Sequence, residues 1–157
     1  MTIAKELIVL IAEDDDGHAT LIQEQLEDVG LHNAIHRFRD GAEAWAFLSG
    51  EGAAAGGKVL DPTQSYLLLL DIRMPKMDGV EVLRRIKATP SLHTMPVIML
   101  TTTDDPREVA ECYALGCNSY ITKPVIFDEF SEVIKRLGLF VSVIAVAPLQ
   151  ASIVGSG

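Results

Sequence analysis

Residues 67–70 are four consecutive leucines that run directly into Asp71, and a turn with Asp78 and Gly79 follows. An uninterrupted apolar run between turn residues predicts a strand buried on both faces, as in a parallel sheet. Asp71 then lies at the carboxyl end of this strand, where ligands of open α/β sheets collect. Alternatively, Asp71 only caps the next helix, but Asp78 is better placed for that, directly before Gly79 and the helical run from Val80. We therefore predict a functional role for Asp71.

Strand-like and helix-like segments alternate along the rest of the chain. Apolar runs predict strands over 7–12, 33–38, 67–71, 95–100 and 118–122, and 3.6-residue periodicity predicts helices over 17–29, 41–48, 80–88, 106–115 and 126–137. This order predicts an α/β fold, a (βα)5 doubly wound five-stranded parallel sheet with right-handed crossovers. Residues 49–65, with four glycines and one proline, are expected to form a mobile loop, either functional or disordered.

The length of 157 residues suits one domain, which we place at 1–138, and 48% hydrophobic with 22% charged residues indicates a folded chain. A net charge of −9 argues against nucleic-acid binding, because phosphate backbones need a basic surface. The apolar segments are too short to span a membrane, and no signal peptide is apparent. Cys112 and Cys117 have no nearby histidine, so we expect two buried free thiols and a cytoplasmic location.

Four consecutive carboxylates, residues 13–16, follow the first strand. They could form a solvated acidic turn in which Asp15 or Asp16 caps the next helix. Their position favours a functional role, because they too lie at the carboxyl end of a predicted central strand. We therefore expect part of this cluster to reach the same rim of the sheet as Asp71.

Polar side chains end four of the predicted strands: Glu13 and Asp14, Asp71, Thr101, and Lys123. Clustered carboxylates repel one another until one protonates, unless a cation neutralises them. Mg²⁺ prefers oxygen ligands and commonly bridges carboxylates to a phosphoryl group, whose other oxygens Thr101 and Lys123 could bind. A carboxylate can itself accept a phosphoryl group as an acyl phosphate. The residues therefore predict a magnesium-dependent phosphoryl site.

Four motifs together resemble the receiver domain of two-component response regulators: EDD at 13–15, LLLLDIRMPKMDG at 67–79, PVIMLTT at 96–102 and GCNSYITKP at 116–124. The resemblance covers about residues 5–138 and implies a flavodoxin-like fold. It also implies that Asp71 accepts phosphate from a sensor histidine kinase, and that the chain is a signalling protein rather than an enzyme with a substrate of its own.

The same resemblance implies roles for individual residues. Mg²⁺ would be bound by Asp14, Asp71 and the backbone carbonyl of Arg73, with Glu13 holding the water shell of the ion. Arg73 and Thr103 stand at positions that tune the lifetime of the acyl phosphate.

The resemblance also implies which residues move when Asp71 is phosphorylated and which residue binds the phosphoryl group. Thr101 and Tyr120 would form the switch pair, Lys123 would contact a phosphoryl oxygen, and the peptide bond before Pro124 would be cis. The insertion at 49–65 resembles regulators paired with phytochrome photoreceptor kinases, which implies a (bacterio)phytochrome as the kinase.

Residues 139–148 form an uncharged run with strong strand character. It could fold back over its own core, or it could be an arm exchanged with a second subunit, since so much exposed apolar surface finds a partner. We predict a homodimer built on this arm, with no output domain attached and a frayed end from 150 to 157.

Two other functions compete with the signalling receiver. A phosphatase or a haloacid-dehalogenase-like phosphotransferase also uses a strand-end aspartate with magnesium, but such enzymes generally place a second aspartate two residues later, where this chain has Arg73. A scaffold that keeps only the fold is disfavoured by the intact set of polar strand ends. Transfer of phosphate to a histidine phosphotransfer protein is as consistent with the residues as allosteric output.

Overall fold

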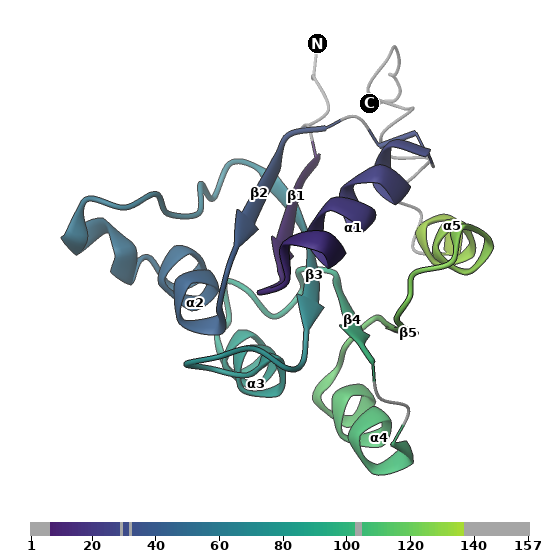
Figure 1. Cartoon of the computed structure of the whole chain (residues 1–157). Helices are drawn as coiled ribbons and strands as arrows, with labels where there is room; N and C mark the ends of the chain where they lie inside the picture. Colours follow the sequence, from purple (N-terminus) through teal and green to yellow (C-terminus); the bar gives the residue numbers. More distant parts are fainter. Residues whose placement is uncertain (1–6, 29, 32, 103–104, 137–157) are drawn as a thin grey trace, which may run out of the picture.

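Five parallel strands form one sheet, flanked by helices on both faces (Figure 1). The structure is a computed structural model that describes residues 7–28, 30–31, 33–102 and 105–136. The strands are β1 (Leu7–Ala12), β2 (Ile35–Phe38), β3 (Ser65–Asp71), β4 (Val97–Thr101) and β5 (Ser119–Thr122), in the order β2-β1-β3-β4-β5. The helices are α1 (Asp16–Asp28), α2 (Gly41–Ser49), α3 (Gly79–Ala88), α4 (Pro106–Leu115), α5 (Phe127–Arg136) and the 3-10 helix η1 (Glu51–Ala55). The predicted (βα)5 fold is confirmed.

The leucines of β3 are fully buried and divide the core into two layers. Leu67 and Leu69 pack in the layer that contains the buried side chains of α1 and α5. Leu68 and Leu70 pack in the opposite layer, with those of α2, α3 and α4. β3 therefore has no solvent-facing side, which explains why leucine occupies four consecutive positions in it.

The register of the sheet brings the polar strand ends to one rim. Ala12 at the end of β1 pairs with Leu70, next to Asp71. Asp71 pairs with Leu100, and Thr101 pairs with Thr122 at the end of β5. Because all five strands are parallel, residues up to 110 positions apart in the sequence meet at their carboxyl ends.

The turn after β3 is held against the strand at Gly79. The amide of Gly79 donates to the carbonyl of Ile72 at 2.8 Å. A Cβ atom at this position would lie 2.1 Å from the carbonyl oxygen of Asp71, so only glycine lets α3 begin here. The Asp78 carboxylate accepts from the Glu81 amide at 2.9 Å and caps α3, as its position predicted.

The glycine-rich segment 49–65 differs from the expected mobile loop, because η1 occupies part of it. The amide of Leu60 donates to the carbonyl of Phe47 on α2, and the amide of Asp61 donates to the Tyr66 hydroxyl at 2.9 Å. Gly50 and Gly56 adopt positive φ on either side of η1. These local bonds, which hydropathy patterns do not reveal, tie the segment to α2 and β3.

Several predictions fall on residues that the structure does not describe. They concern the apolar arm 139–148, the end of the last helix at 137, and Thr103. Among the helices of the described ranges, none has the length and apolar character that crossing a membrane requires.

A pair of leucine substitutions tests the position of the core. Leu69→Ala removes a fully buried side chain from the central strand and should lower the free energy of unfolding by about 2–5 kcal/mol. Leu21→Ala removes the same atoms from a side chain of α1 that is 51% exposed, and should change it by less than about 1 kcal/mol. Urea denaturation of both variants measures the difference, and equal effects would contradict a fully buried β3.

Candidate functional site

Three carboxylates meet at the carboxyl ends of β1 and β3. Glu13, Asp14 and Asp71 each offer an oxygen, and these oxygens all lie within 4.8 Å of one another. Glu13 and Asp71 are buried, whereas Asp14 is exposed. Two carboxylates enclosed by protein and one open to solvent form a site that a cation can enter from one side.

The ammonium of Lys123, which follows β5, lies against this group. Its Nζ atom lies 2.6 Å from Glu13 Oε1 and 3.4 Å from Asp71 Oδ2. The side chains of all three residues are at most 5% exposed. A buried ion pair is stable only if its partners remain hydrogen-bonded, so this contact fixes the Lys123 side chain beside Asp71.

The four consecutive carboxylates at 13–16 have separate roles. Glu13 binds Lys123, and Asp14 joins the carboxylate group. Asp15 accepts from the amide of His18 at 2.9 Å and caps α1, which lowers the pKa of Asp15. Asp16 pairs with Arg37 and Arg39, which hold its pKa below the usual range. Capping by Asp15 is therefore confirmed, whereas the functional role of Glu13 and Asp14 remains a prediction.

The carboxyl group of Asp71 has an elevated proton affinity. Its burial, together with the charge of Glu13, raises the pKa of Asp71 to about 7, and the charge of Lys123 offsets part of this shift. One ammonium therefore does not balance the buried carboxylates. A divalent cation beside Asp71 would favour its ionised form, in which it can act as a nucleophile.

The donor set fits a hard metal ion. All three groups are carboxylates, which suit Mg²⁺, Ca²⁺ or Mn²⁺ rather than the soft ligands that copper and iron–sulfur sites use. The raised pKa of Asp71 also favours a cation at this place, because Lys123 alone does not balance the buried carboxylates. Because Glu13 already binds Lys123, Asp14 and Asp71 would be the better direct ligands, and Glu13 would be left to hold water of the ion.

Thr101 and Tyr120 lie together on the face of the sheet covered by α3 and α4. Thr101 ends β4 and is fully buried, and Tyr120 is partly buried in β5. Burial raises the pKa of Tyr120 to about 12, and a hydrogen bond with the Thr101 side chain opposes that shift. The structure thus joins the two residues of the predicted switch pair, while their motion remains a prediction.

Arg73 and Pro124 complete the predicted set. The Arg73 side chain extends to α4, where its Nη2 atom lies 3.1 Å from Glu108 Oε2. A role of the Arg73 carbonyl toward a metal remains a prediction. The peptide bond between Lys123 and Pro124 is cis, as the resemblance implies.

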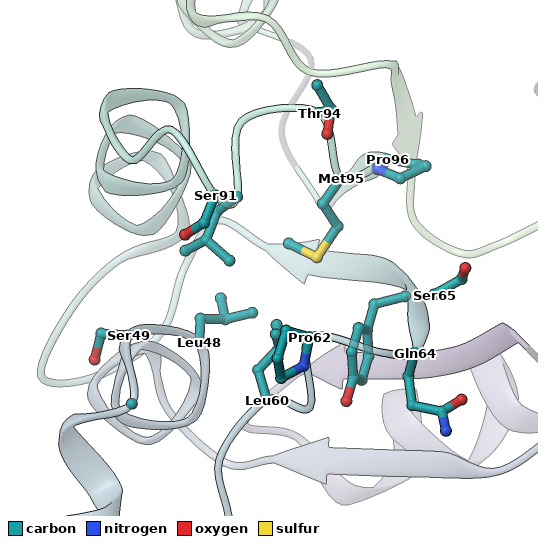
Figure 2. Close-up of a pocket in the computed structure, with 13 residues that line it drawn as sticks. Leu48, Ser49, Leu60, Pro62, Gln64, Ser65, Ser91, Thr94, Met95 and Pro96 are labelled. Carbon is teal, nitrogen blue, oxygen red and sulfur yellow. The ribbon is translucent and has the colours of Figure 1, made fainter. Parts of the chain in front are cut away.

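A cavity of about 480 Å³ lies at the opposite end of the sheet from the carboxylates, between the end of α2, the start of β3 and the segment before β4 (Figure 2). Leu48, Leu60 and Met95 point into it, and serine, threonine and glutamine side chains surround them. No charged side chain of the described residues lines this cavity. This cavity therefore does not suit a phosphoryl group. The site formed by Glu13, Asp14 and Asp71 is the better candidate.

Sequence reasoning missed two residues of the site. The imidazole of His18 lies 3.1 Å from Lys123 Nζ, and the guanidinium of Arg37 donates twice to the Glu13 carbonyl, at 2.8 and 3.1 Å. His18 could have been found from its position three residues after the cap Asp15, in the first turn of α1. No sequence signal places Arg37, because its contact depends on the pairing of β2 with β1.

Comparison with known proteins gives one family. The family described as "Response regulator receiver domain" matches residues 9–135. The response regulator Rcp1 of Synechocystis is 36% identical over 133 residues, which cover 85% of this chain and 87% of Rcp1.

Solved structures agree with this match. The Mn²⁺-bound form of Rcp1 has a TM-score of 0.68 at 31% identity and covers 92% of this chain and 99% of its own. A receiver domain from Rhodospirillum rubrum has a TM-score of 0.67 at 40% identity, with coverages of 87% and 94%. The phosphorylated cyanobacterial phytochrome response regulator RcpA has a TM-score of 0.68 at 34% identity, with coverages of 94% and 100%.

A pair of aspartate substitutions tests the metal ligands. Asp14→Asn removes one charged ligand and should weaken Mg²⁺ binding by at least about tenfold, since hard cations depend on charged oxygen ligands. Asp16→Asn makes the same change of charge two residues away, where the carboxylate binds arginines, and should weaken binding by less than about twofold. Isothermal titration with Mg²⁺ compares them. Equal losses would show that overall charge, rather than this set of ligands, attracts the ion.

Proposed function

The chain belongs to the receiver domain family of response regulators, and from that premise we propose that Asp71 is its phosphoacceptor. The observation that carries this proposal is the buried contact of Lys123 with Glu13 and Asp71 beside an exposed Asp14. This group of residues combines a nucleophile, Asp71, with an ammonium that can bind phosphoryl oxygens and with carboxylate ligands for Mg²⁺. We place the receiver domain at residues 1–138, around the matched range 9–135, and propose that the apolar arm 139–148 and a frayed tail follow it.

The proposed reaction is an in-line transfer from a phosphohistidine. A carboxylate oxygen of Asp71 forms a bond to phosphorus, the bond between phosphorus and the histidine nitrogen breaks, and the electron pair of that bond stays on the imidazole. Mg²⁺, held by Asp14, Asp71 and the Arg73 carbonyl, would neutralise charge on the transferred group. Water can later attack the phosphorus, which breaks the P–O bond to Asp71, releases inorganic phosphate and restores the carboxylate.

The residues around Asp71 act by position and charge. The Lys123 ammonium already lies 3.4 Å from Asp71 Oδ2, so it can bind a phosphoryl oxygen without a large movement. The Thr101 hydroxyl, at the end of the adjacent strand, is proposed to bind a second phosphoryl oxygen and to leave Tyr120 when it does so. This exchange of partners would couple phosphorylation to the face of the sheet covered by α4.

The proposed phosphodonor is a sensor histidine kinase, and the likeness to RcpA, a phytochrome response regulator, supports a (bacterio)phytochrome kinase. Output would pass through protein contacts or through a histidine phosphotransfer protein. A cytoplasmic location is consistent with two buried free thiols, whose pKa values burial raises to about 12 for Cys112 and about 11 for Cys117.

A phosphatase that uses an aspartyl phosphate is not favoured. Such an enzyme needs an acid–base group near the nucleophile to act on a separate substrate. Two residues after Asp71 stands Arg73, whose side chain is directed to Glu108 on α4. A guanidinium stays protonated and cannot exchange protons in this role.

We further propose that the arm 139–148 joins two copies of the chain in a homodimer. The support is its sequence, ten residues without a charge, which would otherwise expose apolar surface. A two-fold arrangement lets each copy bind the arm of the other.

Substitution of the phosphoacceptor tests the main proposal. Asp71→Asn should abolish labelling by radioactive acetyl phosphate in the presence of Mg²⁺, because an amide cannot form an acyl phosphate. Asp78→Asn changes another aspartate of the same turn to a residue that caps helices equally well, and should be labelled normally. Persistent labelling of Asp71→Asn would disprove the assignment.

Truncation tests the arm. Removal of residues 139–157 should yield a monomer that is still labelled by acetyl phosphate, because the site lies wholly within the preceding domain. Multi-angle light scattering of the full and the shortened chain measures the mass. A shortened chain that stays dimeric would locate the interface elsewhere.

A further inference from the structure

The buried ammonium of Lys123 has a third neighbour besides Glu13 and Asp71. The Nδ1 atom of His18 lies 3.1 Å from Lys123 Nζ, close enough for a hydrogen bond. The two residues are 105 positions apart, one on α1 and one directly after β5. The contact therefore depends on the tertiary structure and not on local sequence.

The chemistry of the two groups fixes the direction of this hydrogen bond. An ammonium carries three N–H donors and no acceptor, so His18 Nδ1 can only be the acceptor of this hydrogen bond. Glu13 Oε1 at 2.6 Å and His18 Nδ1 at 3.1 Å then each accept one N–H, and Asp71 Oδ2, at 3.4 Å, is a further ion-pair partner of the ammonium. Since the Lys123 side chain is only 5% exposed, these side chains replace water.

The sequence places the imidazole through the cap of α1. Asp15 Oδ1 accepts from the backbone amide of His18 at 2.9 Å, which fixes the first turn of the helix. The His18 side chain is 41% exposed, and with Lys123 it lines a cavity of about 190 Å³ that also contacts Leu21. His18 and Lys123 therefore both border a space beside the site.

We propose that His18 is a positioning residue for phosphoryl acceptance: its Nδ1 atom holds the Lys123 ammonium in place beside Asp71. The inference rests on the proposed function of Asp71. When a phosphoryl group is on Asp71, one N–H of Lys123 must turn to that group while the others remain bonded. The bonds to Glu13 and His18 hold the ammonium with its Nζ atom 3.4 Å from Asp71 Oδ2, so the third N–H needs only a small turn to reach a phosphoryl oxygen there.

Two substitutions at His18 separate its acceptor from its bulk. His18→Leu fills similar space without an acceptor and leaves one N–H of a buried ammonium unsatisfied. His18→Asn places its amide oxygen at the same distance along the side chain as Nδ1, and should restore the bond. Leu21→Ala, in the same cavity and on the same helix, is the control for effects on packing.

The first measurement observes the contact itself, in the full-length chain. Nitrogen-15 NMR of lysine ammonium groups should show slow exchange of the Lys123 protons with water in the unchanged protein, in Leu21→Ala and in His18→Asn. His18→Leu should speed this exchange by about tenfold, as expected for loss of a hydrogen bond to a charged group. Slow exchange in His18→Leu would overturn the proposal.

The second measurement follows the rate of labelling by acetyl phosphate at saturating Mg²⁺. His18→Leu should reduce the rate by about tenfold, whereas His18→Asn and Leu21→Ala should stay within about twofold of the unchanged chain. An equal loss in His18→Asn and His18→Leu would overturn the acceptor role. If the unchanged chain is not labelled but its ammonium protons exchange slowly, the proposed function fails and takes the positioning role with it, while the bond between His18 and Lys123 stands.

Discussion

The ammonium of Lys123 and the carboxylate of Glu13, 2.6 Å apart and almost fully buried, join the ends of β5 and β1 across the sheet. Removing two charges from water costs several kcal/mol each, so this pair is stable only with complete hydrogen bonding. Here Lys123 also donates to His18 Nδ1, and Asp71 Oδ2 lies 3.4 Å from the ammonium as a further ion-pair partner. The desolvation penalty of the Lys123 ammonium is already included in the free energy of folding. A phosphoryl group on Asp71 would therefore meet a cation that does not have to lose its water again.

The sheet order explains how such distant residues meet. β1 and β3 are adjacent in the middle of the sheet, so the carboxylates at their ends become neighbours, and β4 separates β3 from β5 by one strand. That spacing sets Thr101 between Asp71 and the chain that leads to Lys123. Gly79 adds the last constraint, because the close approach of α3 to the Asp71 carbonyl excludes any side chain there. The polar rim is thus a consequence of strand order and of one glycine.

The sequence was sufficient for the parts of the structure that depend on local patterns. The leucine run predicted β3, and the polar residues at the strand ends predicted the rim that unites Glu13, Asp14, Asp71 and Lys123. Contacts that depend on tertiary placement were not predictable: His18 contacts Lys123 only because the fold brings the first turn of α1 to the residue after β5. The segment 49–65 was assigned to a mobile loop because glycine frequency is a local signal, whereas its bonds to α2 and β3 are not.

The contacts of α4 indicate where a change at Asp71 can reach the surface. Of the five α-helices that the structure describes, α4 has the fewest buried residues, with Cys112 alone. Ion pairs tie it to the turn after Asp71 through Arg73 and Glu108, and to α3 through Arg84 and Glu111. Surface ion pairs contribute at most about 1 kcal/mol each, far less than the buried residues of α3 contribute. A shift of the turn after Asp71 or of Thr101 would therefore displace α4 at lower cost than any other described α-helix, and we infer that α4 would carry the effect of phosphorylation to the surface.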